Sequence, residues 1–220
     1  SVFYPRDVKW SVSITEGEGS GKQQAQQAAE SGVDLVVAYG GDGTVKDVVG
    51  GLINTDVPLA LLHGGTGNAM AYDLSIPPDL TQAVELIFAN GKLHKIDVGK
   101  VSCQGVAGPG YFLLRASVGL QSQIVSAATR EFKDQFGNLA YVIASLRSLA
   151  KSEPISYQLT IDGEDKVVQG LVCMITNSAS VGGPRQFRFA ADVDPGDGML
   201  DVFVLDTSFE SILSSILEPD

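Results

Sequence analysis

Two glycine-rich segments contain the residue types that could do chemistry in this 220-residue chain. Residues 40–44 read GGDGT and residues 64–68 read GGTGN; they are called here the first and the second glycine loop. Glycine accepts positive φ and lets the backbone approach a ligand closely. Several N–H groups turned inward, followed by a helix that starts near Thr44, make an anion site. The pattern therefore predicts phosphate binding at both loops.

Asp42 is the only acid within the two loops. A carboxylate among phosphate-binding amides repels a bare phosphate, so its presence favours a Mg²⁺ ion or a substrate hydroxyl between them. We expect Asp42 to be the catalytic residue, holding Mg²⁺ or orienting the hydroxyl. Thr44, Thr66 and Asn68 are expected to fix the phosphates or the loop geometry. A plain tight turn is the alternative, which is less credible for two such loops than for one.

Alternating strands and helices must position these loops. Each loop follows a short apolar run, residues 35–39 and 58–62, which predicts a buried parallel strand. Ligands of open parallel sheets lie beyond the carboxyl ends of the strands, so both loops could serve one molecule. The other elements expected in this α/β part are a strand at 8–14, helices at 21–31 and 45–53, and a helix from the N-cap Asp79 to Ala89.

The second half of the chain is richer in strands. Residues 157–161 alternate and 167–176 return as their partner across an Asp162-Gly163-Glu164 turn, which predicts a hairpin. We expect a strand at 95–100 to leave the first domain, which gives domains 1–98 and 99–220. The fold class is therefore α/β, with a parallel Rossmann-like domain followed by an antiparallel β-sandwich. The remaining elements expected in the sandwich are strands at 110–118 and 200–205 and a helical insertion at 136–151.

The two glycine loops, followed by Leu74-Ser75-Ile76-Pro77, resemble the catalytic domain of the diacylglycerol and sphingoid lipid kinases. Segments at 97–99, 117–120 and 197–202 extend the resemblance over most of the chain. It implies a nucleotide-binding domain and a β-sandwich that admits acyl chains; Phe112, Leu114, Phe132, Phe136 and Tyr141 are candidate pocket residues, although such spacings are commoner in a core. The resemblance implies nucleotide contacts from Thr15, Gly40, Gly41, Asp42, Gly43, Thr44, Gly65, Thr66, Gly67 and Asn68.

The sequence departs from these relatives at several positions. Lys46-Asp47 stands where they often have Asn-Glu, and Ala69-Met70 stands where many have Asp-Phe. His63 replaces a frequent proline, and a structural histidine is favoured over a catalytic one. The family's general base lies in a late DGE-like segment that returns to the first domain. Since 162–164 is interpreted as a turn and that return segment is expected to be absent, no base is assigned.

Residues 192–199 gather three acids in a loop that also contains Pro195 and glycines. Carboxylates and main-chain carbonyls at this density suit Mg²⁺. The resemblance implies that Asp194, Asp197 and the backbone of Met199 hold a structural Mg²⁺; a solvated acidic turn is the alternative. Arg185 and Arg188 could reach a phosphate or these acids.

Composition excludes several classes of protein. The net charge of −11 argues against a nucleic-acid partner and offers no polybasic anchor for anionic lipid. No apolar run is long enough to span a bilayer and no signal peptide is evident, which favours a cytoplasmic protein; the lipid substrate that the resemblance implies would make it peripheral at the membrane. The two cysteines fit reduced thiols. A Walker loop at 17–22 is rejected because it is one residue short and Gln23 replaces the Mg²⁺-binding hydroxyl.

These observations together predict an enzyme, a lipid kinase that uses ATP and Mg²⁺. It would transfer the γ-phosphate to the hydroxyl of a diacylglycerol-like or sphingoid lipid at a membrane surface. Two alternatives stay open: another GGDGT enzyme such as an NAD kinase, and a non-catalytic nucleotide or lipid sensor. Assembly into a homodimer is also left open.

Overall fold

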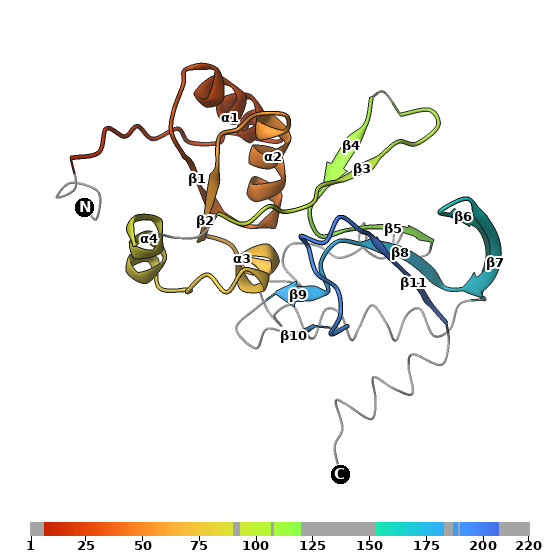
Figure 1. Ribbon diagram of the computed structural model, residues 1–220. Helices are drawn as coiled ribbons and strands as arrows, with labels where there is room; N and C mark the ends of the chain where they lie inside the picture. The colour runs from red at the N-terminus through yellow and green to blue at the C-terminus, as the bar shows by residue number, and fades with distance from the viewer. Residues whose placement is uncertain are drawn as a thin grey trace, which may run out of the picture. The chain divides into compact units, whose positions relative to one another are not determined.

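A computed structural model describes residues 7–89, 93–106, 108–119, 153–182, 187–188 and 190–206. Its contacts divide the chain into two compact units. Unit 1 comprises residues 1–113 and 180–191, and unit 2 comprises residues 114–179 and 192–220. Figure 1 labels the elements of both units. The helix expected at 136–151 lies outside the described residues, as do Phe132, Phe136 and Tyr141.

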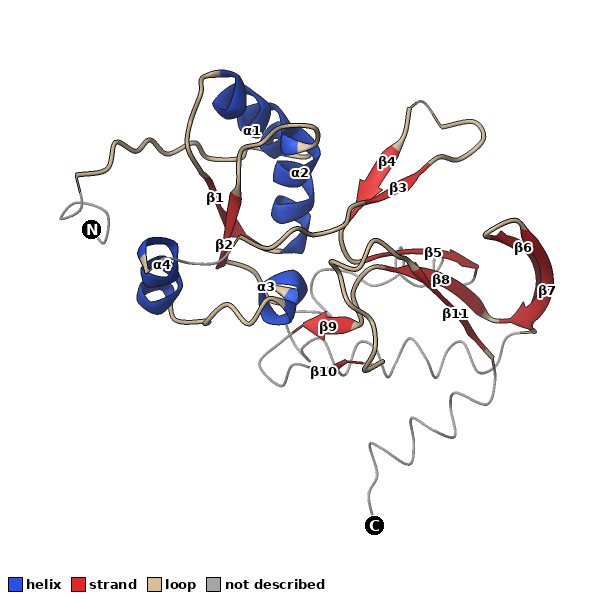
Figure 2. Ribbon diagram, viewed as in Figure 1, coloured by secondary structure: helices blue, strands red, loops and turns tan. Residues whose placement is uncertain are grey.

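Unit 1 alternates strands and helices in its first half, as predicted. Strands β1 and β2 pair in parallel with a continuous register from Val36↔Leu59 to Gly40↔His63. Helices and strands of this unit are coloured by type in Figure 2. In chain order they are α1 (Ser20–Glu30), β1 (Val36–Gly40), α2 (Asp42–Leu52), β2 (Leu59–His63), α3 (Ala69–Asp73), α4 (Leu80–Phe88), β3 (Gly99–Val101), β4 (Gly110–Phe112), β9 (Ser180–Gly182) and β10 (Phe187–Arg188).

Helices α1 and α2 pack closely because each presents a glycine to the other. A β-carbon on Gly51 of α2 would lie 2.9 Å from Cβ of Ala25 and 3.0 Å from N of Gln26. A β-carbon on Gly21 of α1 would lie 3.2 Å from Cβ of Asp47. All three distances are tighter than ordinary contacts, so a side chain at either position would push the two helices apart or displace a neighbour. The helix that follows the first glycine loop is thereby fixed against α1.

Helix α4 confirms the prediction of a capped, amphipathic helix. Oδ1 of Asp79 accepts a hydrogen bond from N of Gln82 at 2.9 Å, which satisfies a donor of the first turn. Ala83 and Val84 are buried against Leu62 of β2, with Ile76 and Phe88 packed around them. This cluster fixes α4 beside the strand that leads into the second glycine loop.

Unit 2 is built from antiparallel strands. Its three-stranded sheet has the order β11-β8-β5, and β6 pairs with β7 as a hairpin. Asp162 and Gly163 have φ of 52° and 85°, as a two-residue hairpin turn requires, so the predicted turn is confirmed. The elements are β5 (Arg115–Gly119), β6 (Ile155–Ile161), β7 (Glu164–Gly170), β8 (Val172–Thr176) and β11 (Asp201–Leu205).

Some strands differ from the predictions. Residues 8–14 have no assigned strand, and Trp10, Val12 and Ile14 are exposed, because none of the described segments pairs with them. The strand expected at 95–100 is limited to the residues of β3 that pair with β4. The single strand expected at 110–118 is interrupted at Leu113 and Leu114, where the chain passes from unit 1 to unit 2.

The two units also differ from the domain limits expected from the sequence, 1–98 and 99–220. Strand β3 pairs with β4, and β4 contacts α2, so residues 99–113 stay with unit 1. Residues 180–191 return to unit 1, where β9 contacts α3. The sequence analysis anticipated no such return.

Candidate functional site

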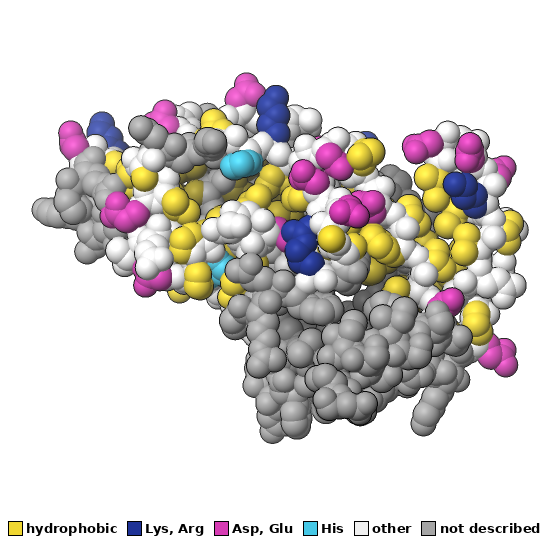
Figure 3. Space-filling model, turned by 60° about the horizontal axis from the view of Figure 1, so that its bottom comes forward, with side chains coloured by type: hydrophobic (Ala, Val, Ile, Leu, Met, Phe, Trp, Pro, Cys, Tyr) yellow, Lys and Arg dark blue, Asp and Glu magenta, His cyan; other side chains and the backbone are white. Residues whose placement is uncertain are grey.

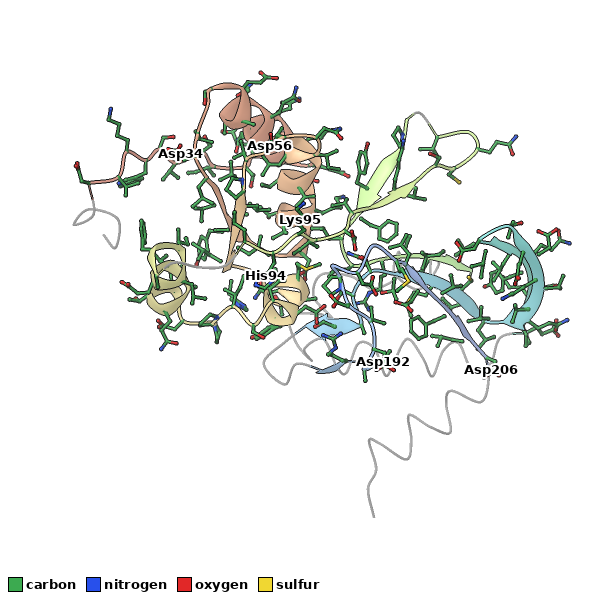
Figure 4. All side chains as sticks on the ribbon, in the orientation of Figure 1. Asp34, Asp56, His94, Lys95, Asp192 and Asp206 are labelled. Carbon is green, nitrogen blue, oxygen red and sulfur yellow. The ribbon has the colours of Figure 1, made fainter. Side chains whose placement is uncertain are left out.

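The two glycine loops lie side by side at one edge of the β1–β2 pair. Gly40, the last residue of β1, is aligned with His63, the last residue of β2. N of Gly64 donates a hydrogen bond to O of Gly40 at 3.2 Å. Asp34 and Asp56, which precede β1 and β2, lie at the opposite end of the strands (Figure 4). The loops therefore meet at the carboxyl edge, as the sequence predicted.

Packing of the second glycine loop on the first requires glycine at positions 64 and 65. A β-carbon on Gly64 would lie 2.7 Å from N of Gly40. A β-carbon on Gly65 would lie 3.1 Å from N of Gly41, and one on Gly40 would lie 2.6 Å from Cβ of Thr44. These glycines hold the two backbones in contact, and the Thr44 side chain covers Gly40.

Gly43 is different from its neighbours. A β-carbon there would meet no atom within 4 Å, and Gly43 is not among the residues with positive φ. It is an exposed residue in the first turn of α2, where glycine is about 1 kcal/mol less favourable than alanine. Neither packing among the described residues nor backbone conformation requires a glycine at this position. The glycine instead keeps space open beside the start of α2.

Helix α2 starts at Asp42, earlier than the sequence predicted, so Asp42, Gly43 and Thr44 are helical. An acid in the first turn is favourable because it faces the positive end of the helix dipole. The N-cap residue Gly41 makes no side-chain cap hydrogen bond. A helix N-terminus whose N-cap residue has no side-chain acceptor is a common setting for an anion.

Asn68 fixes the shape of the second glycine loop. Its Oδ1 accepts from N of Gly65 at 2.9 Å, and its Nδ2 donates to O of Gly65 at 2.7 Å. The residue is buried and has a φ of 50°, a conformation that asparagine tolerates better than most residues. Of the two roles expected for Asn68, the structure shows the one in loop geometry. Thr66 beside it is exposed.

His63 has structural contacts. Its Nε2 donates to O of Ile76 at 2.8 Å, and its ring packs edge to face on Tyr72 with centroids 4.7 Å apart. These contacts hold the chain that follows α3 against the end of β2. They agree with the structural interpretation made from the sequence.

Thr15, the remaining nucleotide-binding candidate, is exposed and precedes α1. Its Cγ2 lies 3.5 Å from the position of a β-carbon on Gly21, which also faces Asp47 of α2. N of Gly19 donates a hydrogen bond to Oδ2 of Asp47 at 3.0 Å. The sequence analysis noted Asp47 only as a departure from the relatives and assigned it no role.

The acidic loop, residues 192–199 of unit 2, uses its carboxylates to stabilise its own turns. Oδ1 of Asp194 accepts from N of Gly196 at 3.0 Å, and Oδ1 of Asp197 accepts from N of Met199 at 2.9 Å. Within the described ranges no group of three or more His, Cys, Asp or Glu side chains could hold a metal ion. Two carboxylates and a carbonyl are nevertheless donors that Mg²⁺ accepts together with water, so the magnesium assignment stays a prediction.

Arg188 contacts an acid that the sequence analysis did not consider. Its Nη1 lies 2.9 Å from Oδ1 of Asp73, the last residue of α3. The pair joins the returning segment of unit 1 to the helix that follows the second glycine loop. Arg185 lies outside the described residues.

Among the helices that the structure describes, none is both long and apolar enough to cross a membrane.

Comparison with known proteins identifies relatives of both units. The Diacylglycerol kinase catalytic domain family matches residues 1–101, and the YegS C-terminal NAD kinase beta sandwich-like domain family matches residues 115–218.

Two curated proteins illustrate the similarity. A "Putative lipid kinase" of Staphylococcus haemolyticus is 32% identical over 216 residues, which cover 94% of this chain and 67% of the relative. An uncharacterized protein of Synechocystis is 32% identical over 186 residues, 83% of this chain. The match spans only 40% of the length of that cyanobacterial protein.

Solved structures give the same picture. A crystal structure of a diacylglycerol kinase from Bacillus anthracis aligns with a TM-score of 0.67 at 26% identity, covering 94% of this chain and 65% of that one. A second structure from the same organism aligns with a TM-score of 0.72 at 27% identity. The paired glycine loops, the two-domain arrangement and these similarities lead to one conclusion: the chain belongs to the diacylglycerol kinase family of lipid kinases.

Proposed function

We propose that this chain is the catalytic region of a kinase that transfers the γ-phosphate of ATP to the hydroxyl of a diacylglycerol-like or sphingoid lipid. Family membership supports the reaction class. The stacked glycine loops and the α2 N-terminus, which has no side-chain cap, support the binding of nucleotide phosphates in unit 1. The nucleotide-binding residues would be Thr15, Gly40, Gly41, Asp42, Gly43, Thr44, Gly65, Thr66, Gly67 and Asn68.

The observation that carries the proposal is the open space at Gly43. Gly40, Gly41, Gly64 and Gly65 have protein atoms near the place where a side chain would be, whereas Gly43 has nothing within 4 Å. An exposed glycine in a helix lowers helix stability, and no contact with the described residues compensates for that loss. A ligand phosphate beside the first turn of α2 gives the missing reason for this residue.

Magnesium would neutralise charge on the phosphates during the transfer. Asp42 is the acid that lies nearest in sequence to the proposed phosphate site, and it would hold this ion or orient the lipid hydroxyl. Asp194, Asp197 and the carbonyl of Met199 would hold a structural Mg²⁺ in unit 2. No residue of the described ranges is proposed as the general base.

The lipid would be reached at a membrane surface by a cytoplasmic, peripheral protein. With a net charge of −11, the chain as a whole offers no attraction to anionic lipid. On the described part of the face in Figure 3, Lys and Arg side chains stand singly among acidic ones. Membrane contact is therefore proposed to come from a local apolar or Arg-bearing patch, and assembly into a homodimer is left to measurement.

One observation favours a second candidate, a nucleotide or lipid sensor without turnover. Ala69, the first residue of α3, is buried where many relatives carry an aspartate. If that aspartate is needed for transfer, this chain would bind its ligands and not react them. Tight ATP or lipid binding without any product would select the sensor.

The test is transfer of labelled γ-phosphate from ATP to diacylglycerol, ceramide, sphingosine and phosphatidylglycerol in mixed micelles, with NAD as a soluble acceptor. The complete gene product is compared with Asp42→Asn and with Asp56→Asn, an exposed acid at the opposite end of β2 that gives the same change of charge. We expect a labelled lipid from the wild type and from Asp56→Asn, and none from Asp42→Asn. Labelled NAD in place of lipid would establish the NAD kinase alternative.

Gly43→Ala tests directly whether the open space beside Gly43 holds a phosphate. The new methyl group meets no protein atom, so the free energy of unfolding should stay equal or rise by about 0.5–1 kcal/mol. ATP affinity should fall at least tenfold, about 1.4 kcal/mol, because the methyl group occupies the proposed phosphate space. Unchanged ATP affinity in this variant would remove the phosphates from the start of α2.

A further inference from the structure

We propose that Asp47 is a positioning residue, which holds the Thr15 loop against α2 and thereby sets the affinity of the enzyme for its nucleotide. The Thr15 loop is defined here as residues 15–19. The effect on nucleotide affinity rests on the proposed function, whereas the anchoring of the Thr15 loop by Asp47 does not.

The central contact joins the N-cap of α1 to the side chain of an α2 residue. Gly19 N–H donates to Oδ2 of Asp47 at 3.0 Å across 28 residues of sequence, in a partly buried setting. Gly19 is the N-cap residue of α1, has a φ of 79° and provides no side-chain cap hydrogen bond to the helix. A carboxylate beside the start of α1 is also favoured by the dipole of that helix. Asp47 thus serves α1 from a different helix.

The Cβ atom of Asp47 also lies close to Gly21 of α1. The β-carbon position of Gly21 is 3.2 Å from Cβ of Asp47 and 3.5 Å from Cγ2 of Thr15. Thr15 and Asp47 therefore approach Gly21 from its side-chain direction at the same place. A larger residue at 21 would displace one of them. The contact brings the expected nucleotide ligand Thr15 within reach of α2.

The Thr15 loop is otherwise closed on itself and on α1. Ser20 Oγ accepts from N of Glu16 at 3.1 Å and donates to O of Gly17 at 2.9 Å. Gln24 Nε2 donates to O of Ile14 at 2.9 Å. The hydrogen bond from Gly19 to Asp47 links this loop to α2. Lys46, 3.7 Å from Asp47 and half exposed, adds little to it.

Helix α2 converts this contact into a constraint on the site. Asp42 and Asp47 lie on the same helix, separated by about 7.5 Å along its axis at 1.5 Å per residue. Because a helix is stiff over this length, Asp47 keeps the Thr15 loop at a fixed position relative to the first glycine loop. Without the anchor, the loop would have to be ordered when the nucleotide binds, which weakens binding.

Three variants separate positioning from general stability. Asp47→Ala removes the acceptor, and Asp47→Asn keeps a side-chain oxygen at the same place. Asp79→Ala is the matched control, since it deletes a carboxylate that accepts a backbone N–H at 2.9 Å elsewhere in unit 1. The measurements on the full-length protein are KM for ATP, kcat with lipid, and Kd for ATP without lipid.

Asp47→Ala should raise KM and Kd for ATP by about 2- to 10-fold, the range expected for ordering of one loop contact. Its kcat should stay within about twofold, and Asp47→Asn should restore both constants. Asp79→Ala should lower thermal stability to a similar extent with unchanged KM. An equal rise of KM in Asp79→Ala, or no rise in Asp47→Ala, would overturn the proposal.

Hydrogen exchange provides a readout that does not depend on kinase activity. The Gly19 amide should exchange faster in Asp47→Ala than in the wild type, while the Gln82 amide is unchanged. Asp79→Ala should show the reverse. If the wild type phosphorylates no lipid but the Gly19 result holds, the proposed function fails and the anchoring role stands. Equal exchange at Gly19 in Asp47→Ala and wild type would refute the anchor itself.

Discussion

Nη1 of Arg188 lies 2.9 Å from Oδ1 of Asp73, although 115 residues separate them in sequence. The Asp73 side chain is only 2% exposed, so its charge depends on the protein for compensation. Asp73 ends α3, and Asn68, the N-cap of α3, closes the second glycine loop. A distant segment of unit 1 therefore stabilises the helix on which that loop is built.

Arg188→Met should lower the free energy of unfolding by about 1.5–3 kcal/mol, because it removes a charged hydrogen bond to a carboxylate that is almost fully buried. Urea unfolding measures the change. Lys166→Met is the matched control, since the Lys166 and Glu164 side chains are 54% and 77% exposed and 3.6 Å apart. That control should change stability by less than about 1 kcal/mol. Equal effects in the two variants would contradict a buried, stability-determining pair at Asp73.

Asn68→Ala should destabilise unit 1 by about 2–3 kcal/mol, the sum of two hydrogen bonds to Gly65 and the penalty for alanine at positive φ. Asn54, an exposed residue with a φ of 64°, offers a control in which only the second effect is expected. Asn54→Ala should therefore lower stability by about 1 kcal/mol. Thermal unfolding of both variants checks the difference. A loss of stability at position 68 no greater than that at position 54 would contradict the role of the Asn68 side chain in fixing the second glycine loop.

Local patterns predicted the centre of this molecule well. Short apolar runs before each glycine loop indicated β1 and β2, and the carboxyl-edge rule placed the loops together, as the hydrogen bond from Gly64 to Gly40 shows. The Asp79 cap and the Asp162-Gly163 turn were also local signals that the structure confirms. The start of α2 was missed because Asp42 favours a helix N-terminus as readily as a loop.

The other failures depend on tertiary contacts. Residues 8–14 alternate like a strand, yet a strand needs a partner, and none of the described segments pairs with them. The partners of Asp47 and Arg188 are distant in sequence, so composition and periodicity could not identify them. The interruption at Leu113 likewise depends on where the chain changes units, which an apolar run does not reveal.

Ser75→Gly should stabilise the protein by about 1 kcal/mol. Ser75 follows the C-cap of α3 with a φ of 55°, where its N–H donates to O of Tyr72 and the next N–H, of Ile76, donates to O of Ala71. Glycine adopts this left-handed position without steric strain. Ser31→Gly at the end of α1, where φ is −79°, should give no gain. Urea unfolding of both variants is the measurement, and a loss at position 75 would contradict the left-handed cap.

The stability of unit 2 should fall at alkaline pH. Burial raises the pKa of the Cys173 thiol above its ordinary 9.0. Burial is also the main cause that raises the pKa of Tyr157 above 10.0. At alkaline pH the folded state therefore keeps protons that the unfolded state releases. The stability contributed by these two protonated side chains is fully present below their unfolded pKa and is lost as the pH rises through their folded pKa.

Urea unfolding midpoints should accordingly be constant near pH 8 and decline above about pH 9, where an unfolded thiol ionises. Cys173→Ala lowers stability at every pH by leaving a cavity, but it should reduce the slope between about pH 9 and 10 because one of the two groups no longer titrates. Cys103→Ala, at an exposed thiol, should keep the wild-type slope. If Cys173→Ala keeps that slope as well, the buried thiol contributes nothing to the alkaline loss and Tyr157 must account for it.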